Sequence, residues 1–263
     1  MRRFRLWGLL GLLAATLSWA AHDIYSRRAR NEWQRPLEVA VALVQLASTD
    51  PAASSALRAR FSVLEASLAS EYHRYGGTLP RPVHFILFGP VSVDRGPPAD
   101  PDSSLLGLVQ HAYAQWRWTH AVDLGTDLPA RGFDSRIYVL LRPPHDSTRS
   151  WVEGSSELGG RVGLARIELT PATVDLALFV VTHELLHTLG ASDKYDANGR
   201  ALIPDGLVEP NRVPLYPQRF AEVMTRNLVL APGSERPPES LAELGVGATT
   251  AREIGWSSSE PLK

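Results

Sequence analysis

Hydrophobic and polar positions alternate in two distinct ways along the first two thirds of the chain. Three almost continuous apolar runs are typical of strands covered on both faces. They lie at residues 37–46, 83–88 and 137–141. Residues 50–76 and 103–121 instead carry apolar side chains at helical spacing, so each predicts a helix. Residues 162–169 alternate as a half-exposed strand does.

Further details of this pattern predict which surfaces are buried. In the second helix one stripe is expected to face the core; it consists of Leu106, Val109, Tyr113, Trp116 and His120. The polar residues 143–160 predict a long surface loop. Residues 160–165 are either a sheet edge that pairs with an extended substrate or a strand that closes the sheet.

The order of elements is strand, helix, strand, helix, strand, strand and helix. It predicts an α/β fold with a mixed, twisted sheet and packed helices. After residue 193 the chain is rich in proline and glycine, so we expect an irregular region that ends in a short helix at 248–254. We expect one folded domain at 37–263, divided into an upper subdomain at 37–190 and a lower subdomain at 191–263.

The N-terminus has the layout of an export signal. Arg2, Arg3 and Arg5 precede the uncharged run at residues 6–21. This run fits either a cleaved signal peptide at 1–21 or a retained signal anchor, followed by a basic linker at 22–36. We therefore expect a periplasmic or extracellular protein, with a membrane anchor if residues 6–21 are retained.

The amino-acid composition limits the partners, metal ligands and nucleophiles that the chain can have. The 263 residues carry a formal net charge of -1, which gives no indication of a nucleic-acid partner. The chain has no cysteine, so disulfides, thiolate zinc ligands and cysteine nucleophiles are excluded. Any bound metal must be held by histidine or carboxylate side chains.

Residues 183–187 read His-Glu-Leu-Leu-His within a predicted helix that starts at Thr170-Pro171. His183 and His187 are four residues apart, so both imidazoles project from one helix face and can bind one Zn²⁺. Glu184 lies about 100° further round the helix, beside the metal, where it can take a proton from water.

Gly190 is expected to end this helix in a left-handed turn that returns the chain towards the metal. The next carboxylate, Asp193, is then the expected third ligand, which leaves a fourth position open for water. Asp196 either replaces Asp193, supports a ligand, or caps a turn.

The pattern His183-Glu184-x-x-His187-x-x-Gly190-x-x-Asp193 resembles the metzincin superfamily of zinc peptidases, with aspartate where the usual third histidine stands. Met224 resembles the methionine of the turn that lies beneath the zinc in that superfamily. The resemblance implies an endopeptidase that uses zinc, acts on a peptide or protein substrate, and is expected to be a monomer.

Two other interpretations stay open at this stage. One is an exported or membrane-tethered binding protein with a structural zinc site and no catalysis, against which the intact Glu184 argues. The other is a different zinc-peptidase clan, whose third ligand would be Glu209 or Glu222.

Two tyrosines also lie in the sequence near the motif. Tyr195 or Tyr216 is able to stabilise a tetrahedral intermediate, although packing is the favoured role for each. The remaining histidines are not spaced as metal ligands are, and we expect them to have structural roles or to lie on the surface. They are His73, His84, His111, His120 and His145.

Overall fold

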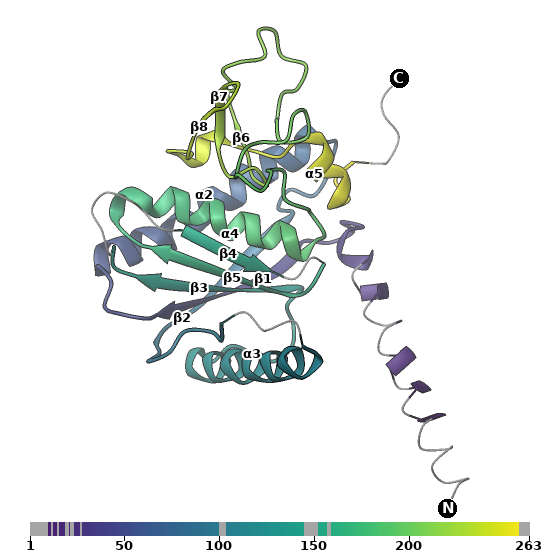
Figure 1. Ribbon diagram of the computed structural model, residues 1–263, viewed down its shortest axis with the longest axis vertical. Helices are drawn as coiled ribbons and strands as arrows, with labels where there is room; N and C mark the ends of the chain where they lie inside the picture. The colour runs from purple at the N-terminus through teal and green to yellow at the C-terminus, as the bar shows by residue number, and fades with distance from the viewer. Residues whose placement is uncertain are drawn as a thin grey trace, which may run out of the picture.

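A five-stranded sheet with helices on both faces forms the centre of the molecule (Figure 1). The computed structural model describes residues 28–99, 104–144, 159–257, the backbone of 152–156, and parts of 10–26. The sheet comprises β1 (Leu37–Gln45), β2 (Val83–Ser92), β3 (Ser135–Arg142), β4 (Val152–Ser156) and β5 (Val162–Glu168). Their order is β2-β1-β3-β5-β4, and all neighbours are parallel except β4 and β5. The predicted α/β fold with a mixed sheet is confirmed.

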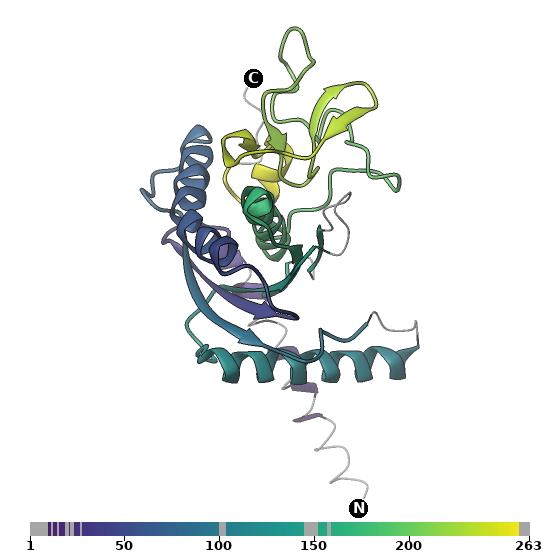
Figure 2. The same cartoon turned by 90° about the vertical axis from the view of Figure 1, so that its left-hand side faces the viewer.

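Helices α2 (Pro51–Arg74) and α4 (Val174–Thr188) cover one face of the sheet, and α3 (Leu105–Thr126) covers the other (Figures 1 and 2). Alternate residues of the central strands are buried on opposite faces, as the period of a strand requires. Val39 and Val41 pack in the core beneath α2 and α4, whereas Ala40 and Ala42 belong to the core next to α3. The continuous apolar runs of β1 and β3 are explained by this double coverage.

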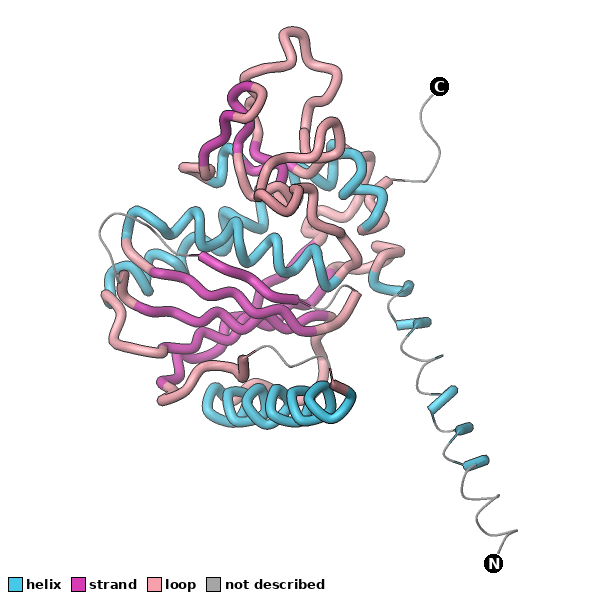
Figure 3. Tube along the Cα trace, viewed as in Figure 1, coloured by secondary structure: helices cyan, strands magenta, loops and turns pink. Residues whose placement is uncertain are grey.

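The chain after α4 is mostly loop (Figure 3). Its short elements are β6 (Ala221–Glu222), β7 (Leu228–Ala231), β8 (Ser234–Arg236), β9 (Leu244–Gly245) and α5 (Ala248–Glu253), with a 3₁₀ turn at Leu241–Glu243. β6 pairs with β9 and β7 with β8, so two small two-stranded sheets lie beyond α4. The predicted irregular region and its final helix are confirmed.

Two predictions about the sheet are wrong. Residues 143–160 are not all loop, because β4 lies within them and forms the antiparallel edge strand. Of the two alternatives for residues 160–165, the sheet edge is wrong, because β5 pairs with β3 on one side and with β4 on the other. The sequence of β4, Val-Glu-Gly-Ser-Ser, is poor in strand-forming residues, which hid the true edge.

The predicted burial of α3 is also wrong. Val109, Tyr113 and Trp116 are 66%, 59% and 58% exposed, whereas Val122 on the other side of the helix is buried. The helix carries apolar side chains around most of its circumference, so spacing alone did not determine which side meets the sheet.

The folded part of the chain starts before the predicted boundary at residue 37. Arg30 and Trp33, expected in a linker at 22–36, are only 4% and 6% exposed. The Arg30 guanidinium donates to the carbonyl oxygens of Asp134 and Gly160, and the Trp33 indole donates to Ile254. The desolvation of an arginine is compensated by such bonds, a possibility that a basic pattern does not reveal.

The segment before Arg28 is only partly described. Among the described residues no helix is long and apolar enough to span a membrane. Much of the predicted signal segment at 1–21 lies outside the described residues, so its role stays a prediction.

The buried position of Trp33 allows a test of whether the folded domain begins before residue 37. Its ring packs against Tyr72 and Trp256, with centroids 5.5 Å and 5.7 Å away. We expect Trp33→Ala to lower the free energy of unfolding by about 3–5 kcal/mol because it opens a cavity in the core. Urea unfolding measures this, with Trp116→Ala as the matched control, expected to change stability by no more than about 0.5 kcal/mol. An equal loss of unfolding free energy in the two variants would contradict a folded domain that begins before residue 37.

Candidate metal centre

Helix α4 carries the histidines of the motif and is buried on nearly all sides. Its entry is a 3₁₀ turn at Pro171–Thr173, where the Thr170 amide donates to the Thr173 hydroxyl at 2.9 Å. Val181 and Leu185 pack in the core, while His183 and Glu184 are 2% and 0% exposed. Polar side chains at such positions require partners within the protein or a ligand, because burial removes their water.

Gly190 ends the helix as predicted. Its φ is +100°, a backbone conformation that favours glycine. The Gly190 amide donates to the carbonyl of His187, and the Ala191 amide donates to that of Leu186, both at 3.0 Å. This pair of bonds is a Schellman motif, which closes the helix and turns the chain sharply. The turn places Asp193 in front of the two histidines.

Three potential ligand atoms converge at this point. The Nε2 atoms of His183 and His187 are 3.0 Å apart, and Asp193 Oδ1 lies 3.3 Å from each. Among the described residues, His183, His187 and Asp193 form the group whose side-chain atoms lie close enough together to hold a metal ion. The predicted ligand residues therefore lie close together, and the side chain of Asp193, 41% exposed, opens the group to solvent.

The imidazoles are oriented by backbone carbonyls from outside the helix. His183 Nδ1 is 3.0 Å from the carbonyl oxygen of Val223, and His187 Nδ1 is 2.8 Å from that of Ala191. A carbonyl only accepts, so each Nδ1 carries the proton and each neutral Nε2 presents a lone pair. Two lone pairs and a carboxylate in contact favour a cation between them, either a proton or a metal ion.

Zinc fits this set of donors. Nitrogen and oxygen ligands at about 2.0–2.1 Å in tetrahedral geometry are roughly 3.3 Å apart, close to the separations seen here. The second nitrogen of each histidine also bonds a carbonyl, an arrangement typical of zinc-binding histidines.

The charges of the group are coupled. Burial raises the pKa of Asp193, but hydrogen bonds and attraction from His183 and His187 in their protonated forms lower it more, so its pKa lies far below the usual range. Burial lowers the pKa of His187, yet Asp193 and the Ala191 carbonyl raise it above its usual value overall. The carboxylate is therefore ionised and favours a positive charge beside it, which a metal ion supplies as readily as a proton.

Glu184 lies next to the group without joining it. One carboxylate oxygen, Oε1, is 3.9 Å from His183 Nε2, and the residue is fully buried. The helical offset predicted from the sequence therefore holds it beside the ligand atoms, within reach of a water molecule placed between the metal and the carboxylate.

Met224 lies in a tight turn behind the histidines. It is fully buried, and the carbonyl of the preceding Val223 is the one that orients His183. The turn is held by Glu222, whose Oε2 accepts from the amides of Met224 and Thr225 at 2.6 Å and 3.0 Å. Its Oε1 accepts from the Gly247 amide and the Thr250 hydroxyl at 3.1 Å and 2.7 Å, which links the turn to α5.

The segment between Gly190 and Met224 is fixed by a buried charge. Lys194 Nζ donates to both carboxylate oxygens of Glu253 at 2.7 Å and 2.9 Å, and to the carbonyl oxygen of Ser192. The Lys194 amide donates to the carbonyl of Met224 at 3.0 Å. The residues on both sides of Asp193 are thereby tied to α5 and to the methionine turn.

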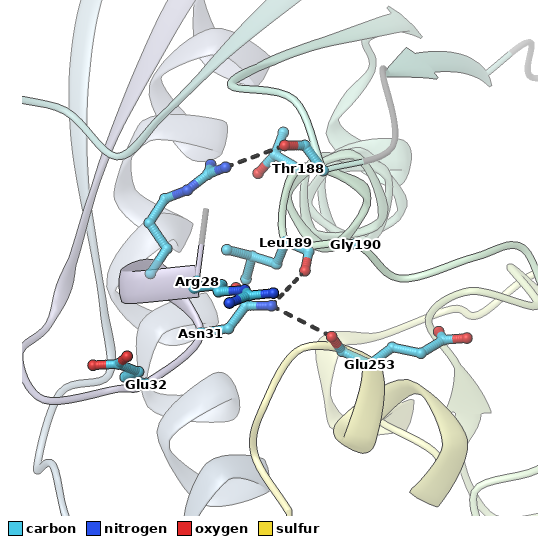
Figure 4. A pocket seen from close by; sticks show the side chains of 9 residues that line it. Arg28, Asn31, Glu32, Thr188, Leu189, Gly190 and Glu253 are labelled. Carbon is cyan, nitrogen blue, oxygen red and sulfur yellow. Dashed lines mark hydrogen bonds between the residues drawn. The ribbon is translucent and has the colours of Figure 1, made fainter. Parts of the chain in front are cut away.

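The far side of the helix end is closed by the N-terminal segment. The side-chain amide of Asn31 donates to the backbone carbonyl oxygen of Leu189 at 2.8 Å and to that of Glu253 at 3.4 Å (Figure 4). The approach is close: a Cβ on Gly255 would lie 2.1 Å from the Asn31 carbonyl oxygen. Residues far apart in the sequence thus brace the turn that delivers Asp193.

Other predicted candidates lie elsewhere. Asp196 Oδ1 accepts from the amides of Asn198 and Arg200, so it caps a turn. Glu209 pairs with Arg219, and Glu222 bonds the methionine turn as described above, so neither joins the ligand group.

Of the two candidate tyrosines, Tyr195 is the one placed near the ligand group. Burial and the nearby Asp193 carboxylate raise its pKa to about 12, although Arg226, 4.8 Å from its ring, lowers it. Its hydroxyl is therefore protonated at neutral pH. Tyr216 is half-buried in the loop that precedes Pro217.

The remaining histidines have structural partners. His73 bonds the Leu79 carbonyl, His84 the Glu38 carboxylate, and His111 the Ala99 carbonyl. His120 stacks on Trp116, and His145 lies outside the described residues.

The supporting residues of the site were not predicted. The carbonyl groups of Ala191 and Val223 have no sequence signal, because any residue supplies a carbonyl. Lys194 and Glu253 are ordinary charged residues in the sequence, and only their burial and pairing identify their role.

Comparison with known proteins adds little to the geometry. No family model matches the sequence, and no curated protein is detectably similar to it. Among solved structures, archaemetzincin from Methanopyrus kandleri is similar at a TM-score of 0.34 and 16% identity, over 64% of this chain and 80% of that chain. A similarity this low does not assign a family or a function.

The identity of the third ligand can be tested by zinc binding. We expect Asp193→Ala to weaken zinc affinity at least tenfold, because it removes one of three ligand atoms and the negative charge among them. Competition with a chromogenic chelator measures the affinity, and Asp196→Ala is the matched control with an unchanged value. A loss in Asp196→Ala but not in Asp193→Ala would reverse the assignment.

The role of Glu222 can be tested through stability. In Glu222→Gln the amide nitrogen must face at least one backbone N–H that now bonds a carboxylate oxygen. We expect a loss of about 1–3 kcal/mol in the free energy of unfolding, because a buried donor is left unsatisfied. Glu239→Gln, at a side chain that is 78% exposed, is the control. Unchanged stability in Glu222→Gln would show that the carboxylate does not hold the turn.

Proposed function

We propose that this chain is a zinc-dependent endopeptidase of metzincin-like design. The observation that carries the proposal is the convergence of His183 Nε2, His187 Nε2 and Asp193 Oδ1, with a carboxylate oxygen of Glu184 3.9 Å from His183 Nε2. A structural zinc site has no use for a buried general base at that position, whereas hydrolysis requires one.

The ligands proposed for zinc are His183, His187 and Asp193. When bound, zinc would lower the pKa of a water molecule towards about 7 and polarise the scissile carbonyl. The carbonyls of Ala191 and Val223 would keep both Nε2 lone pairs directed at the metal.

Glu184 is the proposed general base and then general acid. It takes a proton as the water oxygen forms a bond to the carbonyl carbon of the peptide. As the carbon–nitrogen bond breaks, the same proton passes to the leaving amine, and the carboxylate is restored. Its complete burial keeps bulk water from competing for this proton.

Substrate approaches from the open side of the site. Asp193 is 41% exposed, whereas the histidine side chains are 3% and 13% exposed, so the group is reached past the aspartate. Tyr195 lies next to Asp193, and burial together with the Asp193 carboxylate raises the pKa of its hydroxyl to about 12. Its hydroxyl is suited to donate a hydrogen bond to the oxyanion that develops on the substrate.

The decisive variant is Glu184→Gln, which keeps the shape of the side chain and removes its basicity. We expect zinc to bind with unchanged stoichiometry while kcat on an unfolded, fluorescently labelled protein falls by about 10²–10⁴-fold. Metal analysis and the cleavage assay are run on the same preparation, with Glu239→Gln as the control. Chelation of zinc should abolish cleavage by the wild-type chain, and added zinc should restore it.

Two outcomes would count against the proposal. Wild-type turnover in Glu184→Gln would remove Glu184 from the mechanism. Stoichiometric zinc in the wild-type chain without cleavage of any unfolded protein would instead favour a binding protein with a structural zinc site.

A further inference from the structure

The outward face of α3 is apolar to an extent that is unusual for a soluble surface. Its exposed large side chains are Leu105, Leu106, Leu108, Val109, Tyr113, Trp116 and Leu124, between 48% and 83% exposed. Within the described part of the chain no other helix of the folded domain presents so many. They follow the helix from its first turn to its last.

This face stays exposed because other side chains of the helix are bonded to the sheet. Asp123 accepts from the Tyr138 hydroxyl at 2.7 Å and from Arg136 at 2.5 Å, both on β3. The Trp118 indole donates to the carbonyl oxygen of Arg95, and its ring packs edge-on against Tyr138. Rotation of the helix to bury its apolar face would break these bonds, so the exposure is built into the fold.

The chemistry of the face fits the boundary between lipid tails and headgroups. Tyr113 and Trp116 are stacked at the surface, with centroids 5.9 Å apart, and aromatic rings of this kind favour the membrane interface. Arg117 is the exposed cation of the helix, while its acidic residue, Asp123, faces the sheet. An outward face without a carboxylate does not repel anionic headgroups.

The position of the N-terminal segment indicates what covers this face. The described parts of residues 10–26 continue beyond α3 on the side of the sheet away from α4 (Figures 1 and 2). They too expose large apolar side chains, at Leu10, Leu13, Leu17 and Ile24. Two apolar surfaces from distant parts of the sequence therefore lie on one side of the molecule.

We propose that α3 is a membrane-contact helix that lies in the plane of a lipid bilayer while the N-terminal segment enters the same bilayer. A second copy of the chain packed on α3 would leave the N-terminal side chains exposed, whereas one bilayer covers both surfaces. The metal centre lies on α4, on the opposite face of the sheet, so it faces away from the lipid (Figure 2). This inference does not depend on the proposed peptidase activity.

The absence of cysteine allows a direct test on the full chain. Val109→Cys on α3 and Val213→Cys, a control at an apolar side chain that is 93% exposed in a loop, each carry one environment-sensitive fluorophore. The full chain is reconstituted in vesicles of phosphatidylcholine and phosphatidylglycerol with doxyl-labelled lipid. We expect the lipid to quench the Val109 probe at least threefold more than the Val213 probe. Iodide in the water should quench the Val213 probe more strongly.

Disruption of the face gives the second arm of the test. Leu106→Asp with Trp116→Asp, in the chain labelled at Val109, is expected to remove at least half of the lipid quenching because both changes charge the apolar face. Both side chains are exposed, so folding is expected to be retained and is checked by urea unfolding. Salt up to 0.5 M should leave the wild-type signal unchanged, because the contact is apolar.

Two results would overturn the proposal. Equal quenching of the Val109 and Val213 probes by lipid would place α3 away from the bilayer. Protection of the Val109 probe from iodide that rises with protein concentration without lipid, and is accompanied by no lipid quenching, would identify a second copy of the chain as the occupant.

Discussion

Two hydrogen bonds from imidazole Nδ1 atoms to backbone carbonyls determine what the site can do. Helical spacing brings His183 and His187 to one face of α4, but it leaves the rotation of each ring undefined. The carbonyls of Val223 and Ala191 fix the rings and assign the protons, so that both Nε2 lone pairs meet. The two histidines form a group that can hold a metal ion only together with chain segments outside the helix.

The position of the Val223 carbonyl depends in turn on a buried carboxylate. Glu222 is fully enclosed, and burial raises its pKa above the usual value, although bonds from Thr250, Gly247 and Met224 lower it. A carboxylate at this position is favourable only because four donors replace its water. The same donors join the methionine turn to the segment that leads into α5. Where the irregular region meets the site it is therefore held mainly by these side-chain bonds, with the short β6–β9 pairing beside them.

The sequence predicted those features that depend on local pattern and missed those that depend on distant partners. The strands at β1, β2 and β3, the entry to α4 and the turn at Gly190 follow from apolar runs, capping residues and the permissiveness of glycine. The convergence of Asp193 with the histidines followed from the same local turn. Arg30, by contrast, reads as part of a basic linker, because its acceptors are carbonyls more than a hundred positions away.

The errors at β4 and α3 have a common cause. A half-covered strand or helix has one side that meets the core, and composition identifies that side only when the other is polar. β4 has Val152 as its one strand-forming residue, and α3 is apolar on both sides, so neither offers the contrast that a prediction requires. For α3 the missing contrast is itself informative, since it accompanies an apolar face that is turned away from the core.

The helices on the two faces of the sheet therefore have different requirements for their side chains. α4 must hold polar ligands inside the protein, and it does so with backbone carbonyls, a buried carboxylate and a lysine pair brought from the C-terminal third of the chain. α3 needs no such support, because Asp123 and Trp118 attach it to the sheet and its outer surface is free to meet another phase. The sheet between them keeps the two environments apart, so that changes in the apolar face of α3 need not disturb the ligand geometry on α4.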